Sequence, residues 1–86
     1  MPEISRFLGI VIQMYFRDHG VPHFHAVYGS YRASFAIATL EILEGELPRR
    51  ARGHVLEWAA DHRAELATDW ELARAREPLR PIAPLE

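Results

Sequence analysis

Three of the five histidines of this chain fall within the eight residues from Asp18 to His25. His23 and His25 are two positions apart and directly follow a proline, in a segment whose residue types predict a β-strand. Side chains alternate across a strand, so we expect the two imidazoles to share one face, about 6–7 Å apart. Imidazole exchanges protons near neutral pH and binds metals readily. This pair is therefore the strongest candidate site in the sequence.

Three interpretations fit the histidine pair. One imidazole can remove the proton of a ribose 2′-hydroxyl while the other protonates the leaving oxygen, which assigns catalytic roles to His23 and His25, with His19 or Asp18 assisting from the preceding turn. The second is a zinc or nickel ion at His23 and His25. The paired-cysteine and HExxH patterns are absent, so we assign no metal ligand and predict no cofactor. In the third, the histidines only orient loops or hydrogen-bond the backbone.

The basic residues are the second chemical feature. All ten are arginines. GC-rich coding explains this usage. Arginine also forms bidentate contacts with phosphate that lysine cannot form. Arg49 and Arg50 begin a predicted helix, where positive charge opposes the helix dipole unless an anion lies nearby. RNA phosphate is one candidate anion, and Arg32 and Arg17 on the strands would extend such a contact surface. The alternative anions near Arg49 and Arg50 are the carboxylates of Glu44 and Glu46, just upstream in the chain.

The histidine pair is positioned by strands predicted within residues 1–47. Apolar residues at every second position from Leu8 to Phe16 predict one long strand with that face in the core. Asp18-His19-Gly20 predicts a turn. Residues 23–28 predict a second strand, with Phe24 on the face opposite the histidines.

The rest of this half continues the same pattern. Gly29-Ser30 predicts a tight hairpin into a third strand that alternates from Tyr31. Residues 40–43 predict a further short strand that ends at Glu44-Gly45-Glu46. We therefore expect an N-terminal antiparallel β-meander of three to four strands.

The hydrophobic period changes at Pro48, and residues 48–77 are predicted to be helical. An apolar stripe predicts a first helix that runs to about Leu66. The Thr-x-x-Glu spacing from Thr68 resembles a capping box, so a second helix is predicted there, with Trp70 and Ala73 inward. The fold class predicted is α+β, with the meander packed against one or two C-terminal helices.

The C-terminal residues 78–86 have a proline at every third position. Polyproline II has three residues per turn, so this spacing predicts an extended Pro-rich tail with Leu79, Ile82 and Leu85 along one edge. Docking of the tail on its own domain is favoured over docking on a partner.

Composition limits the function classes. The chain has 86 residues, a net charge of −2 and no cysteine, which predicts one domain over residues 1–86 without disulfides. No apolar run is long enough to cross a bilayer, so a cytoplasmic location without membrane contact is expected. The slight negative charge provides no general attraction for nucleic acid.

Seven short motifs along the chain together resemble those of a known protein family. They are Met1 to Phe7, Met14-Tyr15-Phe16, Pro22-His23-Phe24-His25, Tyr28-Gly29, Leu43 to Pro48, Leu56 to Ala59 and His62 to Leu66. Together they resemble the DUF4160 family of small bacterial proteins. The resemblance implies a two-gene toxin–antitoxin module in which this chain is the toxin-like component and a small DUF2442-type protein is its antitoxin-like partner. Action on RNA follows only by analogy with other toxins. Of the candidate site residues, the family motif includes only His23 and His25.

Two alternatives to a ribonuclease-like enzyme remain. The chain could be a non-enzymatic protein-binding or transcription-regulating module that docks a partner through apolar surface, or a metal-binding protein. A homodimer is also possible, because unpaired edge strands favour pairing with another chain.

Overall fold

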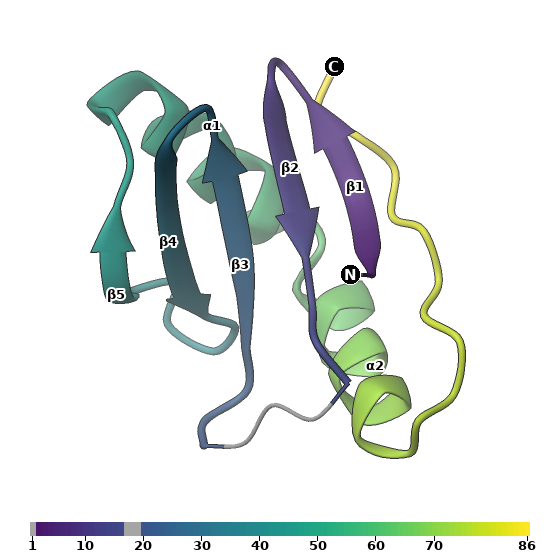
Figure 1. Cartoon of the computed structure of the whole chain (residues 1–86). Coiled ribbons are helices and arrows are strands. Elements are labelled where there is room, and N and C mark those ends of the chain that lie inside the picture. Colours follow the sequence, from purple (N-terminus) through teal and green to yellow (C-terminus); the bar gives the residue numbers. More distant parts are fainter. Residues whose placement is uncertain (1, 17–19) are drawn as a thin grey trace.

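The computed structural model describes residues 2–16 and 20–86. These residues form a five-stranded antiparallel sheet and two helices, so the predicted α+β class is confirmed. The strands are β1 (Glu3–Phe7), β2 (Ile10–Gln13), β3 (His23–Tyr28), β4 (Tyr31–Ala36) and β5 (Ile42–Glu46), and the helices are α1 (Arg49–Asp61) and α2 (Arg63–Arg74). Strand order follows chain order, so each strand pairs with the next (Figure 1). The predicted count of three to four strands is therefore too low.

The additional strand, β1, precedes the long strand that the sequence predicted from Leu8. Leu8 and Gly9 have φ values of +51° and +79° and form a two-residue turn between β1 and β2. Two successive positive φ values are characteristic of the type I′ hairpin turn. Leu8 is 59% exposed at this turn, and Phe16 is 39% exposed. The predicted strand from Leu8 to Phe16 contains β2 but is too long at both ends, because the apolar alternation begins in the turn and continues past Gln13.

The second half of the sheet follows the prediction more closely. β3 has the predicted bounds, and Gly29-Ser30 joins it to β4. The fourth predicted strand is displaced, because β5 begins at Ile42 and includes the Glu-Gly-Glu segment that was expected to end it. Gly45 permits this pairing: its φ is +80°, and a Cβ atom there would lie 2.1 Å from the backbone oxygen of Arg32. Only glycine fits so close to β4.

The helices are divided differently from the prediction. α1 ends at Asp61, and His62, with φ −126°, separates it from α2. The predicted start of the second helix at Thr68 is wrong, since Thr68 lies inside α2. The apolar stripe in the sequence does not reveal the break between α1 and α2 at His62, because both helices keep their apolar residues at helical spacing. Trp70 and Ala73 are buried, as predicted.

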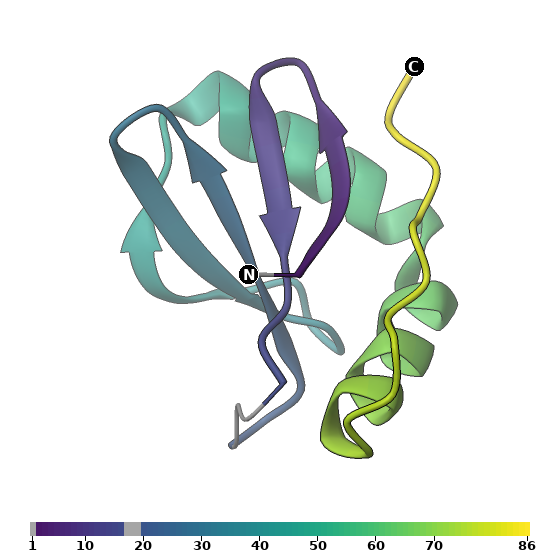
Figure 2. The same ribbon diagram turned by 45° about the vertical axis from the view of Figure 1, so that its right-hand side comes forward.

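The helices pack on one side of the sheet, and the other face is uncovered except near the start of β3, where His23 contacts Trp70 of α2. Figures 1 and 2 show α1 across the back of the sheet and α2 continuing toward the edge formed by β1, with no helix over the front face in the parts of the chain that are drawn as ribbon. The core lies between the sheet and α1. Its largest fully buried side chains are those of Trp58, Phe24, Phe35, Ile4, Ile10, Ile12, Met14 and Leu66.

The C-terminal residues 77–86 have no regular secondary structure and run beside β1 and α2 (Figure 2). Ile82 is buried, and its N–H donates to the carbonyl oxygen of Ile4 at 2.7 Å. The indole N–H of Trp58 donates to the carbonyl oxygen of Ala83 at 2.8 Å. Leu79 and Leu85 pack against the same core. The tail is thus part of the fold.

Within the described residues, no helix has the length and apolar character that a membrane span requires.

Candidate functional site

The two predicted site histidines lie together on the face of β3 opposite Phe24, and the His23 end of this face contacts Trp70 of α2. His23 and His25 are partly buried, whereas Phe24 and Ala26, which alternate with them along β3, are fully buried in the core. The two imidazole centroids are 5.2 Å apart and their planes are inclined by 74°. The expected shared face is therefore present, and neither ring is sealed in the interior.

His23 is held by its backbone surroundings and by α2. Its Nδ1 atom is 2.7 Å from the carbonyl oxygen of Val21. A carbonyl oxygen only accepts hydrogen bonds, so we assign the proton to Nδ1, which leaves Nε2 as the basic nitrogen of the neutral ring. The ring also packs against Trp70, at 5.1 Å between centroids. These contacts fix the orientation of His23.

His25 lies in a polar row that crosses four strands. Its strand neighbours are Gln13 on β2 and Ser34 on β4, and Ser34 in turn pairs with Glu44 on β5. The ring of Tyr15 lies 4.5 Å from that of His25, and the Tyr15 hydroxyl donates to the side-chain oxygen of Gln13 at 3.1 Å. The row places hydrogen-bonding groups on both sides of His25.

Arg32 brings a positive charge to this row. Its guanidinium donates to the Tyr15 hydroxyl and lies 5.7 Å from the centre of the Tyr15 ring. His25, Arg32, Ser34 and Glu44 also line one hollow of about 180 Å³. Among the predicted phosphate ligands, Arg32 is thus next to the histidine pair.

The other predicted site residues are not brought to this row. Arg50 lines a separate hollow with Leu8 and Tyr28. Tyr28 ends β3 and His23 begins it, which separates their positions by about 16–17 Å along the strand. Arg49 precedes Arg50 at the start of α1, so both arginines lie at the far end of the sheet. The predicted site residues Arg17, Asp18 and His19 lie outside the described residues.

The structure adds four residues that sequence reasoning did not select for the site: Gln13, Tyr15, Ser34 and Glu44. Gln13 and Tyr15 alternate with the apolar residues of the predicted first strand, so the sequence placed them together on its opposite face. Their closeness to His25 depends on strand register, and register is set by turn geometry and pairing across the sheet. Ser34 and Glu44 reach His25 only through that register.

The metal interpretation has little support from the described part of the chain. No group of three histidine, aspartate or glutamate residues there is arranged to hold a metal ion. His23 and His25 offer two ligands, and zinc sites usually use three or four protein ligands. The proposed third ligands, His19 and Asp18, are not described, so zinc or nickel at this pair stays a prediction.

Comparison with known proteins gives one match. A family model described as "Domain of unknown function (DUF4160)" matches residues 9–71. No curated protein and no solved structure matches the chain. The matched range extends from the β1–β2 turn into α2, so it includes the histidine pair and the polar row around it.

Proposed function

This chain belongs to the DUF4160 family, and we propose that it is a toxin-like protein that acts on RNA through His23 and His25. The observation that carries the proposal is the pair of partly exposed imidazoles, 5.2 Å apart between ring centroids, on one face of β3. Both rings can therefore reach a single phosphodiester group. Arg32, beside His25, can contact the phosphate oxygens.

The proposed reaction is transfer of the phosphodiester to the neighbouring 2′-oxygen. Nε2 of His23 removes the proton of the 2′-hydroxyl, and the 2′-oxygen attacks phosphorus. The bond from phosphorus to the 5′-oxygen breaks, and that oxygen takes a proton from the imidazolium of His25. The products are a 2′,3′-cyclic phosphate and a 5′-hydroxyl. Arg32 neutralises charge on the phosphate as the bond breaks.

The remaining predicted ligands have secondary roles in this proposal. His19 or Asp18 would assist from the preceding turn, and Arg17 would add to the phosphate contacts near it. Arg49 and Arg50, at the other end of β3, would contact phosphates several nucleotides away along a single strand. Tyr15, two residues beyond the end of β2, also provides an aromatic surface on which a base can stack.

A partner that blocks this face fits the same proposal. The resemblance points to a small DUF2442-type antitoxin-like protein in a bacterial two-gene module, acting in the cytoplasm. Several large apolar side chains are exposed and could contact a partner: Leu8, Val21, Tyr31 and Leu43. Apolar surface of this kind is common where proteins bind each other.

These exposed side chains also favour a second candidate, a protein-binding or transcription-regulating module without enzymatic activity. Leu43 lies on the edge strand β5, which could pair with a strand of another chain or of a second copy. This candidate predicts a stable complex with the neighbouring gene product and no RNA cleavage.

A growth assay separates the two candidates. Cells that express the wild-type chain alone should stop growing, and His23→Ala or His25→Ala should restore growth at an equal level of folded protein. His54→Ala is the matched control, because His54 is also partly buried but lies on α1, and this variant should stay toxic. If both site variants remain as toxic as the wild type, the catalytic proposal is wrong.

A further inference from the structure

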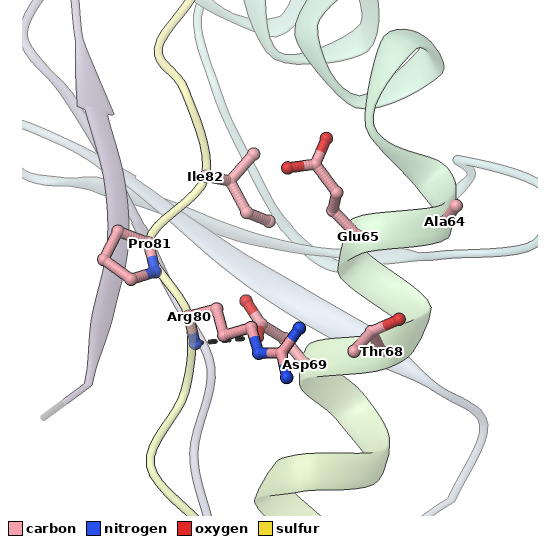
Figure 3. A pocket seen from close by; sticks show the side chains of 7 residues that line it. All are labelled: Ala64, Glu65, Thr68, Asp69, Arg80, Pro81 and Ile82. Atoms are coloured by element: carbon pink, nitrogen blue, oxygen red, sulfur yellow. Dashed lines mark hydrogen bonds between the residues drawn. The ribbon is translucent and has the colours of Figure 1, made fainter.

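A hollow of about 250 Å³ lies between α2 and the C-terminal tail (Figure 3). One wall is formed by α2, with Glu65, Thr68 and Asp69, and the other by the tail, with Arg80 and Ile82. The histidine pair does not line it. Its chemistry can therefore be considered separately from the proposed RNA site.

Asp69 is the unusual residue of this hollow. It is only 1% exposed. Its Oδ1 atom accepts the backbone N–H of Arg80 at 2.9 Å, whereas its Oδ2 atom has no hydrogen-bond partner within the part of the chain that is described. Figure 3 shows this carboxyl group pointing from α2 toward the tail. Buried polar atoms are almost always hydrogen-bonded in folded proteins, so Oδ2 requires a donor.

Opposite charges face each other across the hollow. In Figure 3 the Glu65 carboxyl group extends from α2 into the space before the tail, and the Arg80 guanidinium reaches from the tail toward Asp69 and Thr68. Glu65 also pairs with His62, at 2.5 Å between its Oε1 and the ring Nδ1. The site thus has acidic groups on the helix and a basic group on the tail.

We propose that this hollow binds a small zwitterion of the α-amino-acid class. The ammonium group would donate to Asp69 Oδ2 and to Glu65, and the carboxylate would accept from Arg80. Arg80 would repel a ligand that is only cationic, and Glu65 would repel one that is only anionic. Pockets for drug-sized ligands have volumes of about 300–1,000 Å³, so this smaller hollow suits a ligand below that size.

Entry of the ligand requires movement of the tail. Asp69 Oδ2 is buried in the structure, in which the Arg80–Ile82 segment is docked beside α2. Besides the bond to Asp69, this segment is held by the Ile82 N–H to Ile4. At the joint between α2 and the tail, Arg76 has φ +59°, a left-handed conformation that glycine adopts more readily. The ligand would replace contacts that cover Oδ2.

The proposal is tested by NMR titration of the full chain with L-alanine as the probe. We expect saturable shifts of the backbone amides of residues 64–69 and 80–82. Asp69→Asn keeps the acceptor for Arg80 but loses the charge, and should weaken alanine binding by about tenfold or more, as expected for loss of a charge-assisted hydrogen bond. Glu57→Gln, which removes an exposed carboxylate on α1, should bind alanine like the wild type.

A second variant tests the carboxylate contact. Arg80→Gln leaves the backbone N–H that donates to Asp69, so the tail should stay docked. It should weaken the binding of alanine but strengthen the binding of methylammonium, which has no carboxylate. Absence of saturable alanine shifts in the wild type, or equal alanine affinity in the wild type and Asp69→Asn, would overturn the proposal.

Discussion

Polar groups are hydrogen-bonded differently on the two sides of the sheet, the face that carries His25 (the open face) and the side packed by the helices and the tail. On the open face, Gln13, Tyr15 and Arg32 are joined through the Tyr15 hydroxyl, at a surface where water can complete their hydrogen bonding. On the side of the helices and the tail, Asp69 is enclosed and one of its oxygens has no partner among the described residues. The open face can therefore hold chemical groups with little effect on folding, whereas a polar group on the covered side must be matched by its neighbours.

The largest expected effect is on the covered side. Trp58 is fully buried, packs against Phe7 and Phe24 at centroid distances of 5.3 and 6.0 Å, and donates to the tail at Ala83. Trp58→Ala should lower the free energy of unfolding by about 3–5 kcal/mol. Urea denaturation followed by circular dichroism measures this loss. A change below about 1 kcal/mol would contradict the assignment of this residue to the core.

The register of the open face depends on Gly45. Gly45→Ala would place a Cβ atom against the backbone of Arg32 in a left-handed conformation, and should lower the free energy of unfolding by about 2 kcal/mol or more. The matched control is Gly53→Ala in α1, where nothing lies within 4 Å of the added atom. This second change should raise the free energy of unfolding by about 1 kcal/mol. Equal effects of the two variants would show that the close approach of β4 and β5 is wrong.

Replacement of a site histidine should affect stability much less. His25→Ala removes a partly buried ring and its contact with Tyr15, which should cost about 1 kcal/mol of unfolding free energy. The same denaturation experiment tests the value beside Trp58→Ala. A loss as large as that of the tryptophan variant would mean that His25 is a core residue, and would remove the contrast between the two faces.

The smallest effect concerns pH. Burial raises the pKa of Asp69 above its ordinary value, although the hydrogen bond and the charge of Arg80 oppose this. Folding therefore favours the protonated acid more than the unfolded chain does, so the contribution of this group to stability is complete below about pH 4, the ordinary pKa of aspartate, and is lost as pH rises through the higher folded pKa. Glu65 on the same helix and Arg80 on the tail are the charges that act on Asp69.

Thermal unfolding of the wild type and Asp69→Asn from pH 3 to pH 7 measures this effect. The wild type should lose stability relative to the variant as pH rises from about 4, because asparagine does not ionise. Parallel profiles of the two proteins would show that Asp69 has the same pKa in the folded and unfolded chain.

Local patterns predicted part of the fold. The alternation of His23 to Tyr28 gave β3 with its correct faces, and the spacing of Trp70 and Ala73 gave the buried side of a helix. The β1–β2 turn was missed, because Leu8 is an uncommon residue for a left-handed conformation and fitted the apolar alternation that continues into β2. The break at His62 was missed because helical spacing continues across it.

The candidate site was predicted in its centre but not in its surroundings. The two-residue spacing of His23 and His25 was sufficient to place both rings on one face. Arg49 and Arg50 were grouped with them by residue type, yet lie at the other end of the sheet. Gln13 and Ser34 reach His25 through pairing between strands, which depends on long-range register. Asp69 gave no signal, because a single acidic residue in a charged helix predicts exposure.

We propose that the pair formed by His23 and His25 cleaves RNA. The most direct test is incubation of the purified chain with a single-stranded RNA and with the same strand carrying 2′-O-methyl groups, followed by analysis of the product ends. We predict a 2′,3′-cyclic phosphate and a 5′-hydroxyl from the first strand, no cleavage of the second, and at least about a hundredfold loss of rate in His23→Ala and in His25→Ala. Cleavage of the methylated strand, or undiminished cleavage by both variants, would contradict the account, as would an RNA left intact by the wild type.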